Sequence, residues 1–425
     1  VESLRKIKSV RSVQTADWRI AVLLAGMFVA LTSLVGLVSV ETQLGWADWL
    51  QAAEMPPAGP AKPVVGQPEK LQRFEYAAEA MAEPLRIILY AADEPTAERA
   101  AQAALDRIRQ LNDILSDYDP ESELRRLCDR AGTGEPVRVS EDLFRVLAAA
   151  QRWSQQTDGA FDMTVGPVVR LWRRARRTRQ MPEQAAIDQA RQLVGYQNVL
   201  LDPDRQTALL KKAGMRLDPG GIGAGYAIDE ALRVVFKHGI TRVLIDLGGD
   251  IRLGDPPPDR PGWRIGVPGL DPKAPPKEFL LLSRCAIGTS GDAWQFVELG
   301  GRRYSHIVDP KTGMPLTERS SVTVVAPDGL TADVLGTAVS VMGPEKGIKL
   351  VDQTPGASAW MIRATENGLV TIASSRWNQL SREKPSQTEK SSPSGSSAVE
   401  PGTKSPPQEK TDFISPAKRS GAAKP

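Results

Sequence analysis

Apolar residues recur every three or four positions along residues 101–115, which is the spacing of one face of an α-helix. The predicted buried face carries Ala101, Ala104, Leu105, Ile108, Leu111 and Leu115. A second helix is predicted from Ser140 to Thr157. Ser140 is its expected N-cap, because serine accepts a hydrogen bond from the free amides of a first helical turn.

Short apolar runs elsewhere predict buried β-strands. They span Leu85 to Tyr90, Val243 to Leu247 and Val322 to Val325. A hairpin is predicted further along, because two apolar stretches, 360–362 and 369–372, flank an Asn-Gly pair that favours tight turns. Hairpin strands with helices elsewhere favour an α+β fold with mixed or antiparallel sheets over a doubly wound parallel sheet.

The longest apolar run lies near the N-terminus. Residues 20–40 read IAVLLAGMFVALTSLVGLVSV, 21 residues without a charge, which is long enough to cross a bilayer as a helix. Lys and Arg residues precede the run and acidic residues follow it, so we expect the N-terminus in the cytoplasm and the body outside it. A cleaved signal peptide is the alternative, although its apolar region is usually shorter. The expected localisation is the inner (cytoplasmic) membrane, single-pass, with the body on the periplasmic or extracytoplasmic side.

Composition divides the chain into five segments. We expect a cytoplasmic N-terminus at 1–19, the anchor at 20–40, a Pro-rich linker at 41–70 and a folded domain at 71–380. The remainder, 381–425, is rich in Ser, Pro and Lys and has too few apolar residues to fold, so it is predicted to be disordered.

Charge and cysteine content narrow the possible partners. The net charge is +3 and charges of both signs are mixed through the body, so we expect no nucleic-acid partner. The dense basic cluster at 173–177 is interpreted as a solvated helix face. Cys128 and Cys285 lack the spacing of a zinc site, and whether they form a disulfide is left open.

Two segments have chemistry that suits phosphate and metal. The loop LDPGGIGAGYAID, which starts at Leu217, leads into an apolar-periodic helix, and amides at a helix start can hold an anion. Its spacing matches neither the dinucleotide fingerprint nor a P-loop, and a plain tight turn is the alternative. In TADVLGTAVSVMG, Asp333 and Thr337 share one helix face, which suits a hard cation such as Mg²⁺. The alternative is an acidic residue in the first turn beside a small packing residue.

One of the chain's two histidines, His306, lies in RRYSHIVDPKTGMP, just before an Asp-Pro pair that predicts a tight turn. A surface histidine beside a hairpin loop is the structural alternative. Two further segments, LIDLGGD and the Ser/Thr/Gly loop AIGTSGD, which ends at Asp292, could each be an ordinary turn.

The order of these segments is more informative than any one of them. Along the chain come SDYDPESEL, DGAFDMTVGP, DPGGIGAGYAID, DLGGD, TSGD, HIVDPKTGMP and ADVLGT. This set resembles the FAD:protein FMN transferases, the ApbE-type flavin transferases, from about Met81 to Gly343. The resemblance implies an ApbE/T-fold-like α+β domain that uses Mg²⁺. It also implies an activity: transfer of FMN from its substrate FAD to a threonine hydroxyl of an exported acceptor protein, with release of AMP.

The resemblance implies roles for individual residues. His306 falls on the histidine proposed to deprotonate the acceptor hydroxyl, and Asp292 is a candidate to orient that ring or to act as the base. The Mg²⁺ ligands would be Asp333, Thr337 and the backbone carbonyl of Gly221. The contacts to FAD would come from Met81, Tyr118, Ala160, Phe161, Asp162, Asp218 and Ile307.

Two positions depart from the family pattern. Ala224 stands where a lysine is usual, which removes a cation from beside the pyrophosphate unless an arginine replaces it. Cys128 stands where an asparagine is usual. Two alternatives to transfer therefore stay open. One is an FAD-binding protein or an FAD pyrophosphatase, and the other is a structural envelope protein that keeps only the fold.

Overall fold

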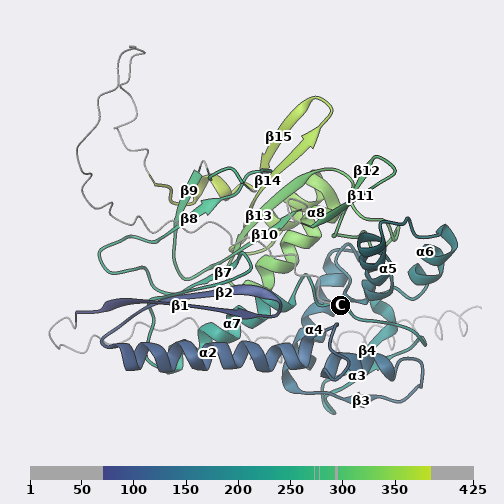
Figure 1. Cartoon of the computed structure of the whole chain (residues 1–425), viewed down its shortest axis with the longest axis horizontal. Helices are drawn as coiled ribbons and strands as arrows, with labels where there is room; N and C mark the ends of the chain where they lie inside the picture. The colour runs from purple at the N-terminus through teal and green to yellow at the C-terminus, as the bar shows by residue number, and fades with distance from the viewer. Residues whose placement is uncertain (1–69, 272, 277, 292–294, 384–425) are drawn as a thin grey trace, which may run out of the picture. The chain divides into compact units, whose positions relative to one another are not determined.

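Eight β-strands form one sheet in the computed structural model of this chain, which describes residues 70–271, 273–276, 278–291 and 295–383 (Figure 1). Their order is β1-β2-β6-β7-β10-β13-β14-β15, and every neighbouring pair is antiparallel. The strands are β1 (Gln72–Ala80), β2 (Glu83–Ala91), β6 (Val243–Leu247), β7 (Asp250–Leu253), β10 (Ala286–Gly291), β13 (Ser320–Ala326), β14 (Ser358–Thr365) and β15 (Gly368–Ala373). The predicted α+β fold with antiparallel sheets is confirmed.

Three helices pack together along this sheet. They are α2 (Glu94–Leu115), α7 (Gly223–Lys237) and α8 (Gly329–Gln353), and α7 packs against both of the others as well as against β6 and β7. Helix α2 begins where Asp93 accepts a hydrogen bond from the Thr96 amide at 2.8 Å. Its apolar face is buried as the periodicity predicts, except that Leu105 lies at the edge of that face.

A second apolar core lies where the sheet packs against β8 (Trp263–Val267), β9 (Glu278–Leu282) and the 3-10 helix η3 (Trp377–Gln379). Strand β2 shows why the sheet residues read as continuous apolar runs: Ile88 joins this core, while its neighbours Ile87 and Leu89 are also buried. A strand that is covered on both faces has no solvent face on which to place polar residues.

Residues 381–383, assigned to the tail from composition, pair with β9. The Ser381 carbonyl accepts the Leu281 amide at 2.9 Å, and Glu383 pairs with Arg264 at 2.7 Å. The rest of the predicted tail lies outside the described residues, as do the predicted anchor at 20–40 and nearly all of the linker. Within the described ranges, no helix is both long and apolar enough to cross a membrane.

A third cluster of buried residues joins α5 (Gly166–Thr178) and α6 (Gln184–Arg191) to the hairpin of β11 (Phe296–Leu299) and β12 (Arg302–Ser305). We call it the α5–α6 core; its members are Val168, Trp172, Ala175, Ile187, Ala190, Val297, Leu299, Tyr304 and Val308. The remaining elements are α3 (Glu123–Asp129), α4 (Glu141–Gln156), β3 (Val137–Arg138), β4 (Val199–Asp202), β5 (Thr207–Leu210), η1 (Met163–Val165) and η2 (Tyr196–Asn198).

Most predicted elements are confirmed, and two need correction. Ser140 caps α4 as expected, and the strand runs and the last hairpin all form, with Glu366 and Asn367 between its paired ends. Residues 286–291, interpreted as a loop, are strand β10. Helix α8 is longer than the motif indicates, because a second helical stretch continues beyond a kink at Gly343.

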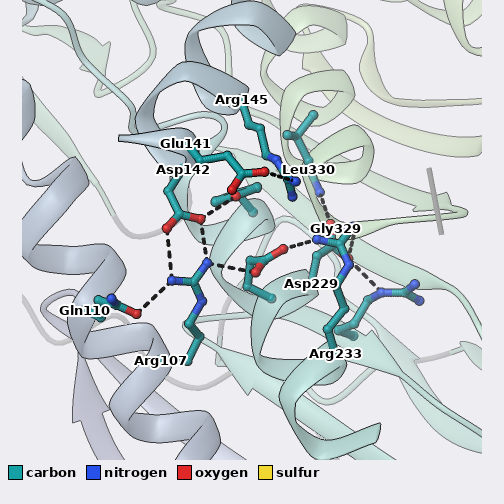
Figure 2. A network of polar contacts seen from close by, with 12 residues as sticks. Arg107, Gln110, Glu141, Asp142, Arg145, Asp229, Arg233, Gly329 and Leu330 are labelled. Carbon is teal, nitrogen blue, oxygen red and sulfur yellow. Dashed lines mark hydrogen bonds and ion pairs between the residues drawn. The ribbon is translucent and has the colours of Figure 1, made fainter. Parts of the chain in front are cut away.

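Charged side chains lock α7 to its neighbours (Figure 2). Arg107 of α2 donates to Asp142 of α4 at 2.5 Å and to Glu230 of α7 at 2.8 Å. Asp142 also accepts the Tyr226 hydroxyl at 2.7 Å. One guanidinium thus holds three helices together, at side chains that are largely buried.

Asp229 ties α7 to the start of α8. Its carboxylate accepts hydrogen bonds from the amides of Gly329 at 2.8 Å and Leu330 at 3.0 Å. It also accepts one from Nε–H of Arg252 at 2.7 Å. Helix amides in the first turn have no partner within the helix, so a buried carboxylate there fixes the helix end. The start of α8, which leads to Asp333, is therefore fixed against the middle of α7, the helix that follows the glycine loop.

Candidate active site

The glycine loop and α8 meet at Gly221 and Thr337. A β-carbon added at Gly221 would lie 2.6 Å from the Thr337 hydroxyl oxygen, closer than side chains approach one another. The crossing is equally close at Gly225, where a β-carbon would lie 2.2 Å from the Gly329 carbonyl oxygen. Only glycine lets the two backbones come this near without displacement.

Asp333 lies one helical turn before Thr337 and is 6% exposed. Its carboxylate accepts the Gly225 amide at 3.2 Å. In a regular helical continuation that amide would bond the carbonyl of Gly221, four residues earlier. The Gly225 amide donates to Asp333 instead, so it does not bond the Gly221 carbonyl. The glycine loop thus contacts α8 at two of the proposed ligands: the Gly221 backbone lies against the Thr337 hydroxyl, and the Gly225 amide bonds Asp333.

The chemical type of these donors fits a magnesium ion. All three donors are hard oxygens, and Mg²⁺ is typically held by one or two carboxylates, with water and substrate phosphates completing its shell. In the described residues there is no group of three or more His, Cys, Asp or Glu side chains that could hold a metal. A site with a single carboxylate leaves places in the shell for the phosphates of a substrate.

His306 is anchored by both its backbone and its ring. Its amide donates to the Gln295 carbonyl at 3.0 Å, and its ring Nδ1 lies 3.1 Å from the same oxygen. A carbonyl oxygen only accepts, so Nδ1 carries the hydrogen and Nε2 keeps the lone pair of the neutral ring. Nε2 is therefore the atom that can take up a proton. The second predicted catalytic residue, Asp292, lies outside the described residues.

The turn after His306 is built as predicted. The Asp309 carboxylate accepts the Lys311 amide at 2.9 Å and the Thr312 hydroxyl at 3.1 Å, and Gly313 adopts a φ of 71°. Ile307, the predicted FAD contact beside the histidine, is 7% exposed. The turn is thus held by its own side chains, with Ile307 packed beneath it.

Helix α5 supports this turn from behind. Trp172 donates its indole N–H to the Gly313 carbonyl at 2.9 Å. Its ring stacks on Tyr304 of β12, with ring centroids 5.2 Å apart. The position of the histidine is therefore set by packing within the α5–α6 core as well as by the turn itself.

Arg173, on the same helix, links two of the predicted segments, SDYDPESEL and the glycine loop. Its guanidinium donates to Asp218 at 2.9 Å, pairs with Asp117 and lies 4.4 Å from the centroid of the Tyr118 ring. Asp218 in turn accepts the Gly220 amide at 2.8 Å. Tyr118 and Asp218, both predicted FAD contacts, are thus joined to the glycine loop through one cation.

This role of Arg173 corrects the interpretation of residues 173–177 as a solvated face. Arg174 and Arg177 are exposed, but the Arg173 side chain is 25% exposed and paired with two carboxylates. No local sequence signal identifies it, because its partners Asp117 and Asp218 lie far away in the chain. Burial and the Asp218 carboxylate raise the pKa of Asp117 to about 6, against the opposing effect of Arg173.

Asp162 is used within its own loop. One carboxylate oxygen accepts both the Thr164 amide at 2.8 Å and the Thr164 hydroxyl at 2.6 Å, and the other accepts the Tyr196 amide at 2.9 Å. Burial raises the pKa of Asp162. Ala160 and Phe161, predicted with it, are buried. A ligand would therefore meet this segment through its backbone, not through the carboxylate.

Met81 lies at the tip of the β1–β2 hairpin. Met81 and Ala82 both adopt positive φ, 52° and 60°, a conformation that side chains with a β-carbon rarely take. The Met81 methyl carbon lies 3.9 Å from where a β-carbon would stand on Gly223. The hairpin tip therefore lies against the start of α7, which brings this predicted contact to the glycine loop.

The two departures from the family pattern have clear positions. The Cys128 sulfur accepts the Leu217 amide at 3.3 Å, next to Asp218, so the side chain still holds the backbone that leads into the glycine loop. Cys128 and Cys285 are both free thiols. Ala224 is half-buried in the first turn of α7 and carries no charge to the loop.

Asp246, in the DLGGD segment, is buried beside β2. Burial raises the pKa of its carboxyl from an ordinary 3.8 to about 7, against a hydrogen bond from the Gly249 amide. The folded protein therefore holds a proton here that the unfolded chain releases near pH 4. This contribution to stability is present in acid and is lost as the pH rises from about 4 to about 7.

We expect Asp246→Asn to remove that pH dependence. The amide oxygen can still accept the Gly249 amide, but it carries no charge to bury. The free energy of unfolding of the variant should exceed that of the parent at pH 8 and differ little from it at pH 4, as denaturant titrations at both pH values would measure. An identical pH profile for the two proteins would contradict the buried neutral carboxyl.

Comparison with known proteins identifies the family. The ApbE family model matches residues 81–361. The chain is 30% identical to the FAD:protein FMN transferase of Haemophilus influenzae, over 68% of this chain and 85% of that protein. It is 32% identical to one from Klebsiella pneumoniae, over 71% of this chain and 92% of the relative.

Solved structures agree with the sequence relatives. The crystal structure of the ApbE protein from Thermotoga maritima matches with a TM-score of 0.66 and 31% identity, over 73% of this chain and all of that one. The flavin transferase ApbE from Vibrio cholerae matches with a TM-score of 0.65 and 29% identity, over 73% of this chain and 99% of that one. The chain therefore belongs to the ApbE family and is a transferase.

Proposed function

We propose that this chain transfers FMN from FAD to a threonine hydroxyl of an exported acceptor protein, releasing AMP in an Mg²⁺-dependent reaction. The contact of the glycine loop with Asp333 and Thr337 of α8, within the ApbE fold, is the observation that carries the proposal. The relatives are FAD:protein FMN transferases, which supports the flavin chemistry. The metal, the threonine and the AMP product are the parts that this proposal adds.

The chemistry follows from the residues in place. Phosphoryl transfer needs positioning and charge neutralisation more than covalent work by the protein. A magnesium ion held by Asp333, Thr337 and the Gly221 carbonyl would supply positive charge to the diphosphate of FAD. The acceptor hydroxyl gives its proton to Nε2 of His306 as its oxygen bonds the FMN phosphorus. The bond from that phosphorus to the oxygen of AMP breaks, and AMP leaves.

A second candidate is supported by Ala224. Without the usual lysine beside the pyrophosphate, the chain could bind FAD without transfer, or hydrolyse it to FMN and AMP. Intact-mass analysis of an acceptor domain, incubated with the protein, FAD and Mg²⁺, separates these functions. A mass gain equal to one esterified FMN supports transfer. Free FMN and AMP with an unmodified acceptor would support hydrolysis. Unchanged FAD would mean that the protein binds FAD without turning it over.

We also propose that the protein is anchored in the cytoplasmic membrane by residues 20–40, with its catalytic domain outside the cytoplasm. The charge-free run after a basic N-terminus supports this orientation. A reporter that is active only in the cytoplasm should stay silent when fused to the C-terminus. An active reporter there would place the domain, and with it the acceptor, on the other side of the membrane.

A further inference from the structure

Helix α5 directs two arginines to the same side. Arg173 and Arg176 are three positions apart, which puts them on one helix face, whereas Arg174 and Arg177 are exposed. Arg173 is committed to Asp117 and Asp218, as described above. Arg176 has a different environment, although it is the next residue along this face.

Arg176 is half-buried and lacks a carboxylate partner among the described residues. Its guanidinium donates to the side-chain oxygen of Gln295 at 3.4 Å, a long and neutral contact. Burial lowers the pKa of Arg176, and the charge on Arg173 acts in the same direction. An arginine nevertheless stays charged in proteins, so Arg176 is a half-buried positive charge that no carboxylate of the described residues neutralises.

The contacts of Arg176 place it within the candidate active site. Gln295, which it reaches with its side chain, uses its carbonyl to hold the amide and the ring of His306. Arg173 and Tyr118 also lie near enough to act on its charge, and Tyr118 is 73% exposed. Arg176 therefore lies near both an exposed tyrosine and the residue that holds the proposed base.

We propose that Arg176 binds the diphosphate of the flavin dinucleotide. This inference rests on the proposed function, because it takes FAD as the ligand. A guanidinium presents a planar fork of N–H donors that matches two phosphate oxygens, and such charge-assisted bonds are stronger than neutral ones. Tyr118 and Gln295, the residue that holds His306, both lie near this cation, so a dinucleotide that reaches from one to the other can place its diphosphate on Arg176. Arg176 on α5 would then supply the positive charge that the family's lysine supplies at the position of Ala224 on α7.

The test is the affinity for FAD of Arg176→Gln, measured by flavin fluorescence in the presence of Mg²⁺. We expect its Kd to rise about tenfold or more, since one charge-assisted contact is lost. The exposed neighbour supplies a matched control: Arg177→Gln removes the same charge one position along and should leave the Kd within about twofold. Arg176→Lys, which keeps the charge but not the fork, should fall between the parent and Arg176→Gln.

Thermal unfolding without FAD distinguishes ligand binding from a structural role. Arg176→Gln should unfold at no lower temperature than the parent, because no carboxylate of the described part of the chain forms an ion pair with Arg176. An unchanged Kd in Arg176→Gln, an equal rise in Arg177→Gln, or a marked loss of thermal stability in Arg176→Gln would overturn the inference. If the parent binds FAD but never modifies an acceptor, the proposed transfer fails while the role of Arg176 stands.

Discussion

Asp333→Ala is expected to abolish Mg²⁺-dependent transfer of FMN. Asp333 is the single carboxylate of the proposed metal site, and the hydroxyl of Thr337 and the carbonyl of Gly221 are neutral. Without it, the site offers Mg²⁺ no anionic ligand from the protein. Activity should be followed as FMN-modified acceptor over a range of Mg²⁺ concentrations, and Thr337→Ala should show a milder loss.

Two further variants keep this result interpretable, because Asp333 also accepts the Gly225 amide. Asp333→Asn retains an oxygen for that amide but loses the charge, so it should fold like the parent and still lose metal dependence. Asp328, the N-cap of the same helix, accepts the Thr331 amide at 2.7 Å. Asp328→Ala should cost about 1 kcal/mol of stability and leave the Mg²⁺ dependence intact. A parent-like Mg²⁺ response in Asp333→Asn would remove the metal assignment.

His306→Asn is expected to reduce FMN transfer by about 10²–10⁴-fold, the usual worth of general-base assistance. Threonine is a poor nucleophile at neutral pH, so removal of its proton in the transition state matters. The asparagine amide can still donate to the Gln295 carbonyl, as Nδ1 does in the parent. The segment should therefore keep its conformation while the proton acceptor is lost.

Binding measurements separate this effect from misfolding. Affinities for FAD and Mg²⁺ should stay near those of the parent in His306→Asn. The second histidine gives the control: His238 is the exposed C-cap of α7, and His238→Asn should transfer FMN normally. Transfer at the parental rate in His306→Asn would assign the base to another group, and Asp292 would be the first to substitute.

The sequence predicts the fold wherever local pattern and tertiary burial agree. Helix α2 and hairpin β14–β15 follow directly from periodicity and turn chemistry. Strand β10 does not, because Gly288, Thr289, Ser290 and Gly291 resemble a loop in composition. A β-carbon at Gly291 would lie 2.5 Å from the Ser320 carbonyl oxygen, so a close tertiary approach, not strand propensity, selects its small residues.

The candidate site can be proposed from the sequence where one short segment contains the chemistry. The spacing of Asp333 and Thr337 on a helix, and the turn after His306, can be read from residues close together in the chain. Arg173 and Arg176 could not be found in this way, because their partners Asp117, Asp218 and Gln295 lie 56, 45 and 119 positions away. Whether an arginine in a basic run meets solvent or a carboxylate depends on which segments the fold brings beside it.

The proposed base and the proposed metal ligands are carried by separate cores. His306 follows β12 and is supported by the α5–α6 core, whereas Asp333 and Thr337 lie on α8 against the large sheet. Mutational drift in either core can thus change the alignment of the two groups without unfolding either one. A shift of about 1 Å can cost about 10²-fold in rate. Within such an enzyme family, turnover can evolve quickly and separately from cofactor affinity, through apolar substitutions that touch no ligand.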